Sequence, residues 1–144
     1  MTVDLLLVED NPGDVRLTEE AFRRENDNVR LHVAADGVEA MAFLKRDGEY
    51  ARVPRPVLIL LDLNLPKLDG REVLVRIKTD ELLKTIPVLV LTLSDAPADV
   101  RNSYQAQANC YLKKPLSLEE FQDLIHSVNR FWLTNVKLMS QPRS

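Results

Sequence analysis

Three short stretches of the chain are almost entirely apolar, at residues 3–8, 57–61 and 88–91, and Asp4 is their one charged member. Such runs are typical of strands that are buried on both faces of a sheet. Residues 29–33 (VRLHV) alternate between apolar and polar side chains, which predicts an edge strand with one exposed face. A fifth short candidate strand begins at Cys110.

Signals for the start of a helix lie between these stretches. Residues 11–14 (NPGD) offer an N-cap asparagine, a proline at the first helical position and an acid at the third. A weaker start lies at residues 95–97. Three further starts have the spacing of a capping box, with an acid three residues after the cap: Asp36 and Glu39, Asp69 and Glu72, Ser117 and Glu120.

Strand and helix signals therefore alternate five times. This order predicts an α/β fold with a parallel sheet, helices on both faces and right-handed crossovers. Only about a dozen residues follow residue 131, too few for a second domain. We expect one domain at residues 1–131, a C-terminal tail at residues 132–144 and no output domain.

Composition and charge narrow the class of protein. A hydrophobic content of 45% supports a packed core, and a net charge of −3 gives no basic footprint for nucleic acid. No apolar run approaches the ~20 residues of a membrane span, and no basic signal region opens the chain. Cys110 is the single cysteine, so no disulfide framework is expected. We expect a cytoplasmic protein that binds neither nucleic acid nor membrane.

Polar side chains follow four of the predicted strands, and in parallel sheets such strand ends share one edge. Carboxylates that cluster there repel one another, and a divalent cation removes that conflict. Oxygen ligands select a hard ion such as Mg²⁺, which often also binds phosphate. An aspartate can act as a nucleophile toward phosphorus, while a metal ion and a lysine neutralise the charge on the group being transferred. The residues at this edge are Glu9, Asp10, Asp62, Thr92 and Lys114.

Four segments carry a family resemblance: LLLVEDNPGD, LILLDLNLPKLDG, PVLVLT and YLKKP. Together they resemble the signature segments of response-regulator receiver domains, the phosphoacceptors of two-component signalling, over residues 3–131. The resemblance implies a doubly wound, flavodoxin-like (βα)5 three-layer sandwich whose five parallel strands have the order 2-1-3-4-5. It implies a phosphoacceptor signalling protein rather than an enzyme, with self-phosphorylation from small donors and autodephosphorylation as further expected reactions.

The resemblance also implies a role for individual residues. Asp62 is expected to accept the phosphoryl group from a sensor histidine kinase. Mg²⁺ is expected to bind Asp10 and Asp62 directly, Glu9 through water, and the main-chain carbonyl of Asn64.

Around the phosphoryl group, Thr92 is expected to bond one oxygen and Lys114 another, with a cis peptide bond between Lys114 and Pro115. Tyr111 matches an aromatic switch, although an ordinary half-buried tyrosine is the alternative. Leu93 departs from the family pattern, in which a small residue gates access to the phosphoryl group. We therefore expect a narrowed entrance and slow self-dephosphorylation.

The C-terminal stretch has an apolar stripe at Phe121, Ile125, Val128 and Trp132. More apolar residues follow than one sheet face is expected to cover, so this stretch either forms an interface or folds back over its own sheet. The segments VEDNPGDVRLTEEAF and SYQAQANCYLKKPLSLEEF, with the FW tail, resemble regulators encoded beside bacterial and cyanobacterial phytochromes.

That second resemblance implies three kinds of partner. They are a phytochrome-type histidine kinase, a second copy of the chain, and a downstream protein or phosphorelay partner. The homodimer is expected to form through the face of the fourth helix, fifth strand and fifth helix together with the tail. Phosphorylation is expected to reshape this face by population shift.

Two rival functions remain open. A pseudo-receiver would share the fold and act as a binding module without being phosphorylated. A haloacid-dehalogenase-like phosphatase would also use Asp62 as a nucleophile. However, Asn64 lies where that enzyme needs a general acid, and the chain is short for a substrate-selecting cap.

Overall fold

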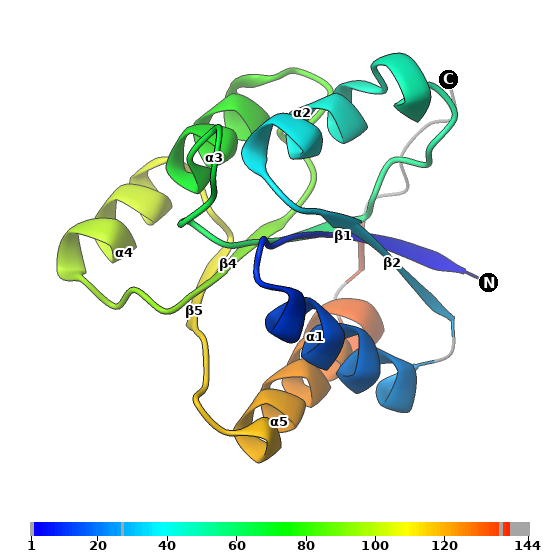
Figure 1. Ribbon diagram of the computed structural model, residues 1–144, viewed down its shortest axis with the longest axis vertical. Helices are drawn as coiled ribbons and strands as arrows, with labels where there is room; N and C mark the ends of the chain where they lie inside the picture. The colour runs from blue at the N-terminus through cyan, green and yellow to red at the C-terminus, as the bar shows by residue number, and fades with distance from the viewer. Residues whose placement is uncertain (1, 27, 136, 139–144) are drawn as a thin grey trace.

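Five parallel strands form a single sheet in the computed structural model, which describes residues 2–26, 28–135 and 137–138. The strand order is β2-β1-β3-β4-β5 (Figure 1), so the predicted order is confirmed. The alternating strand β2 lies at one edge, as its pattern indicates. The strands are β1 (Val3–Val8), β2 (Val29–Ala34), β3 (Leu58–Leu61), β4 (Val88–Thr92) and β5 (Cys110–Lys113).

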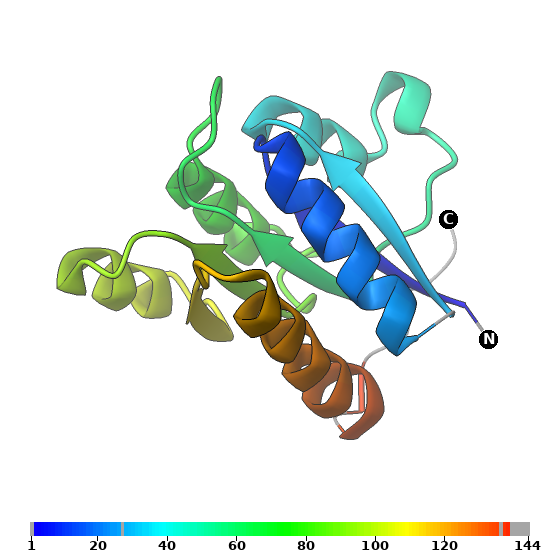
Figure 2. The same cartoon turned by 60° about the horizontal axis from the view of Figure 1, so that its bottom comes forward.

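Five α-helices cover the two faces of the sheet. Helices α1 (Pro12–Glu25) and α5 (Leu118–Val128) lie on one face. Helices α2 (Gly37–Lys45), α3 (Gly70–Thr79) and α4 (Pro97–Gln105) lie on the other (Figures 1 and 2), and a short 3-10 helix η1 (Gly48–Tyr50) follows α2. Within the described parts of the chain, no helix combines the length and apolarity needed to cross a membrane.

Local sequence determines where the helices begin. The side chains of Asn11, Asp36 and Ser117 each accept a hydrogen bond from a main-chain N–H three residues later, as predicted. Asp69 instead accepts from the N–H two residues later. Helix α4 begins at Pro97, and its N-cap residue Ala96 provides no side-chain cap, in keeping with the weaker signal.

The central strands supply a separate hydrophobic core on each face, because successive side chains of a strand point to opposite sides. All four residues of β3 are buried. This two-sided burial explains the continuous apolar runs in the sequence. Leu6, Val8, Ile59, Leu61 and Val90 pack toward α2 and α3, and Leu5, Leu7, Leu58, Leu60 and Leu89 pack toward α1 and α5.

The chain remains helical beyond α5, in a π-helical segment η2 (Asn129–Asn135) at the end of that helix (Figure 2). Trp132 and Leu133 pack on the core beneath α1 and α5, whereas Phe131 is 56% exposed. The predicted boundary after residue 131 therefore falls inside a packed helical segment. The remainder of the predicted tail, apart from residues 137–138, lies outside the described residues.

Candidate functional site

The polar residues predicted to share one edge of the sheet are brought together by the structure. Glu9 and Asp10 follow β1, Asp62 follows β3, Thr92 ends β4, and Lys114 follows β5. Only 3% of Glu9, 6% of Asp62 and 5% of Lys114 is exposed, and Thr92 is fully buried. Asp10 is exposed to solvent. The edge is therefore a nearly dry charged site with one carboxylate open to solvent.

Three of these residues could hold a metal ion. Glu9, Asp10 and Asp62 each offer a carboxylate oxygen, and these atoms all lie within 4.8 Å of one another. Burial raises the pKa of Glu9 to about 7, although the nearby Lys114 opposes this shift. A set of close, hard oxygen ligands fits a divalent cation of the Mg²⁺ or Mn²⁺ type.

Lys114 supplies the positive charge of the site. Its Nζ lies 3.0 Å from Asp62 Oδ2 and 2.9 Å from Asp14 Oδ2, and it also pairs with Glu9. Burial alone would lower the pKa of Lys114. However, hydrogen bonds to Glu9, Asp14 and Asp62 outweigh burial and raise the pKa above its ordinary value. The ammonium group is therefore charged and holds the acidic side chains together.

Asp14 is a site residue that the sequence analysis treated only as a helix-start signal. Helix α1 begins four residues after β1 ends, and its first turn brings the Asp14 carboxylate to 2.9 Å from Lys114 Nζ. The signal that could have placed Asp14 there is its position as an acid in the first turn of the helix that follows β1.

Both carboxylate oxygens of Asp62 have defined partners. Oδ1 accepts a hydrogen bond from the Thr92 hydroxyl at 2.8 Å and from the Asn64 main-chain N–H at 3.1 Å. Oδ2 accepts from Lys114 at 3.0 Å. The structure therefore places a hydroxyl and an ammonium group on the two oxygens of this carboxylate, while their expected bonds to a phosphoryl group stay a prediction.

The predicted cis peptide bond before Pro115 is wrong. Every peptide bond among the described residues is trans. The trans form is favoured by about 0.5–1 kcal/mol for a bond before proline. With this trans bond the Lys114 N–H already donates to Thr92 O at 2.7 Å and its ammonium reaches Asp62, so the site does not require the cis form.

Leu93 is the first residue of the loop between β4 and α4, and Tyr111 contacts this loop. The Tyr111 hydroxyl donates to the main-chain oxygen of Ser94 at 2.6 Å, and its ring is half-buried. Leu93 is 55% exposed. Tyr111 therefore contacts the loop that follows Thr92, which is the position expected of a residue that senses movement of this loop.

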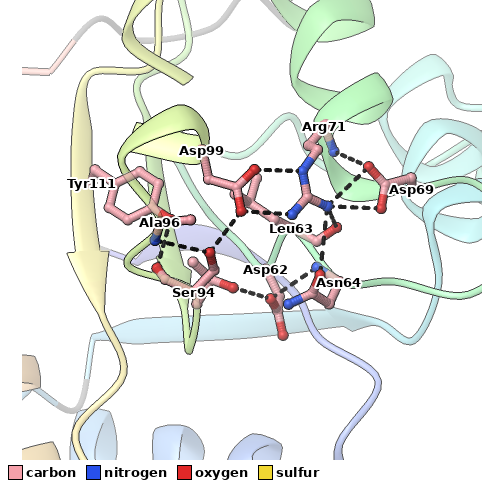
Figure 3. Close-up of polar contacts among 10 residues, drawn as sticks. Asp62, Leu63, Asn64, Asp69, Arg71, Ser94, Ala96, Asp99 and Tyr111 are labelled. Atoms are coloured by element: carbon pink, nitrogen blue, oxygen red, sulfur yellow. Dashed lines mark hydrogen bonds and ion pairs between the residues drawn. The ribbon is translucent and has the colours of Figure 1, made fainter. Parts of the chain in front are cut away.

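A second polar network, which the sequence analysis did not predict, lies next to Asp62 (Figure 3). Arg71 donates from Nε and Nη2 to the two carboxylate oxygens of Asp99, each at 2.9 Å. The Ser94 hydroxyl donates to Asp99 Oδ2 at 2.6 Å. Hydrogen bonds from Arg71 and then Ser94 lower the pKa of Asp99 to about 2. Nothing in the local sequence pattern signals a pair separated by 28 residues.

Comparison with known proteins supports the interpretation of this site. Residues 5–126 match the family model described as the response regulator receiver domain. The response regulator Rcp1 of Synechocystis sp. is 48% identical over 134 residues, which cover 93% of this chain and 91% of Rcp1.

Two solved structures share the fold closely. The phosphorylated cyanobacterial phytochrome response regulator RcpA has a TM-score of 0.94 and 45% identity, covering 97% of this chain and all of that chain. The Mn²⁺-bound form of Rcp1 has a TM-score of 0.92 and 47% identity, covering 96% and 99% of the two chains. With the family match over residues 5–126, these similarities show that the chain belongs to the response regulator receiver domain family.

Proposed function

We propose that Asp62 of this response regulator accepts a phosphoryl group from a phosphohistidine on a sensor histidine kinase. An oxygen of Asp62 attacks phosphorus, the phosphorus–nitrogen bond breaks, and its electron pair leaves with the imidazole nitrogen. The observation that carries the proposal is the placement of the Thr92 hydroxyl and the Lys114 ammonium on opposite oxygens of Asp62. These two donors are positioned to bind oxygens of the transferred group.

The carboxylates of Glu9, Asp10 and Asp62 are proposed to hold Mg²⁺, together with the main-chain carbonyl of Asn64. Their oxygens lie close enough to share one ion. The bound metal would supply positive charge that offsets the charge of the phosphoryl group. Asp10 would provide the solvent-accessible side of the metal site, because Glu9 and Asp62 are buried.

The proposed kinase is of the phytochrome type, in the cytoplasm. Similarity to Rcp1, and to a protein named as a cyanobacterial phytochrome response regulator, supports this partner. We further propose that the signal passes to a downstream protein and that the chain forms a homodimer through α4, β5, α5 and the C-terminal segment. Exposed apolar side chains at Phe131 and Tyr104 support such an interface.

Leu93 is proposed to restrict access to the phosphoryl group. It follows Thr92 directly and is 55% exposed, so its side chain is free to lie over a group attached to Asp62. Replacing Leu93 with alanine should therefore shorten the lifetime of the aspartyl phosphate. An unchanged lifetime would contradict this role.

Intact mass measured after incubation with acetyl phosphate and Mg²⁺ tests the central proposal. A gain of ~80 Da is expected from one phosphoryl group bound to an aspartate nucleophile. The gain should disappear in the Asp62→Asn variant, which keeps the shape of the side chain, and when the metal is chelated. Release of free phosphate without an adduct would favour a phosphatase. If the chain forms no adduct and releases no phosphate, a pseudo-receiver would be favoured.

A further inference from the structure

Arg71 connects two loops that border the phosphoacceptor. One loop joins β3 to α3 and carries Asn64 and Asp69, and the other joins β4 to α4 and carries Ser94. Arg71 Nη1 donates to Asp69 Oδ1 at 3.1 Å and lies 3.5 Å from Asn64 Oδ1. The other two nitrogens of the guanidinium hold Asp99 in the first turn of α4 (Figure 3). One side chain therefore fixes the distance between the two loops.

The contacts of Arg71 extend to the acceptor itself through Asp99. Asp99 accepts from the Ser94 hydroxyl, and the Ser94 main-chain oxygen accepts from Tyr111 at 2.6 Å. Ser94 follows Thr92 by two residues, and the Thr92 hydroxyl lies 2.8 Å from Asp62 Oδ1. The position of the β4–α4 loop, and with it the Thr92 hydroxyl, thus depends on partners on both sides of Ser94.

Helix α4 has little apolar packing of its own. Among its nine residues, all of which are described, Ser103 alone is buried. A cavity of about 130 Å³ separates α4 from α3 and is lined by Leu74, Val75 and Asn102, among others. Because apolar contacts anchor α4 weakly, the bidentate ion pair between Arg71 and Asp99 has a correspondingly large share in placing its first turn.

We propose that Arg71 is a positioning residue for phosphoryl acceptance. Its paired hydrogen bonds to Asp99 hold α4 and the β4–α4 loop where the Thr92 hydroxyl faces Asp62. This inference rests on the proposed function, phosphorylation at Asp62. Lysine at position 71 would keep the charge but lose the planar, two-point contact with Asp99.

The test compares the rate of adduct formation from acetyl phosphate and Mg²⁺ in the wild-type chain and in Arg71→Lys. We expect a rate about tenfold lower in the variant, equivalent to the loss of one charge-assisted hydrogen bond. Arg76→Lys is the matched control. Arg76 lies on the same helix and pairs with Glu72 at 3.4 Å on the exposed surface, away from the site. The rate of adduct formation in Arg76→Lys should match that of the wild type.

Two further measurements separate positioning from a general loss of structure. In a Thr92→Ala background, Arg71→Lys should slow the reaction little further, because Arg71 acts through Thr92. Amide hydrogen exchange of residues 98–105 should become faster in Arg71→Lys and stay unchanged in Arg76→Lys. Asp99→Asn provides a second way to break the pair should Arg71→Lys fold poorly, which urea unfolding will reveal.

The outcomes distinguish failure of the proposed function from failure of the role of Arg71. A wild-type chain that forms no adduct would overturn phosphorylation at Asp62 and this inference with it. A wild-type chain that forms the adduct, with Arg71→Lys and Asp99→Asn equally fast, would overturn the role of Arg71 alone. The same conclusion would follow if Arg71→Lys reduced the rate of adduct formation by the same factor in the Thr92→Ala background as in the wild type.

Discussion

Gly70 begins helix α3 in direct contact with the main chain that carries Asp62. A Cβ atom at this position would lie 2.1 Å from the main-chain oxygen of Asp62 and 2.6 Å from Leu63 Cα. These are backbone atoms at the end of β3, so no side-chain rotation can relieve the contact. Gly70→Ala should therefore force α3 away from the strand end that holds the acceptor.

The cost of this change can be estimated from the packing around it. Leu61 and Leu63, on either side of Asp62, are both fully buried, so the strand end has no free space to move into. Overpacking in such surroundings costs about 1–3 kcal/mol, and occasionally more. Because both sides of the contact are rigid, we expect a loss of about 3 kcal/mol in the free energy of unfolding. That is a large share of the ~5–15 kcal/mol typical of a domain.

Urea unfolding of Gly70→Ala beside Gly13→Ala provides the assay. Gly13 is exposed in the first turn of α1, where a Cβ would meet Asn11 Oδ1 at 3.2 Å. Its replacement should change the free energy of unfolding by less than about 0.5 kcal/mol. Adduct formation from acetyl phosphate should slow in Gly70→Ala alone. Equal stability and equal rates in the two variants would refute the reasoning.

Three other changes test separate parts of the structure. Lys114→Met leaves three carboxylates without their shared cation and should cost about 3–5 kcal/mol without metal. Mg²⁺ should restore more stability to this variant than to the wild type in urea unfolding, and an equal metal effect would count against the charge argument. Asp99→Asn tests the pH dependence of stability. The pKa of Asp99 in the folded state is about 2, below its ordinary value of 3.8. Its ion pair with Arg71 therefore stabilises the fold above pH 4, and this contribution is lost as the pH falls toward 2. The free energy of unfolding of this variant should be about 1 kcal/mol below that of the wild type at pH 7, after allowing for solvent screening. Urea unfolding at pH 3 should show a smaller difference. A difference that does not change with pH would contradict the predicted direction of the pH dependence. Phe131→Ser should weaken self-association, measured as the mass in light scattering, while the free energy of unfolding stays nearly unchanged because this ring is exposed. If the variant has the same mass in solution as the wild type, Phe131 is not part of an interface.

The central part of the site could be predicted because a parallel sheet brings the ends of its strands to one edge. Once the apolar runs locate β1, β3 and β4, the residues after them lie at one edge of the sheet, and the strand order implied by the family resemblance makes them neighbours, whatever their separation in sequence. Asp62 and Thr92 are 30 residues apart and yet form a hydrogen bond. Strand periodicity and the strand order implied by the resemblance therefore place these two residues together, although they do not predict the hydrogen bond itself.

Contacts made by helix side chains could not be predicted in the same way. The pair between Arg71 and Asp99 depends on how α3 and α4 lie relative to each other, and hydrophobic periodicity does not specify that arrangement. The helical segment that continues beyond α5 depends on tertiary packing in a related way. Trp132 and Leu133 pack on the α1 and α5 face, so the helical structure continues as far as that face offers apolar contacts.

The site has two sides that meet at Asp62, and they differ in how readily they can transmit a change. Oδ2 faces Lys114, which is buried and held by Glu9 and Asp14, so movement there would separate charges inside the protein. Oδ1 faces Thr92, whose loop leads to α4, a helix with one buried residue and a cavity behind it. A group added to Asp62 is therefore expected to displace the second side more than the first. The Arg71 pair would then limit how far that displacement travels, since α4 cannot leave its place without breaking it.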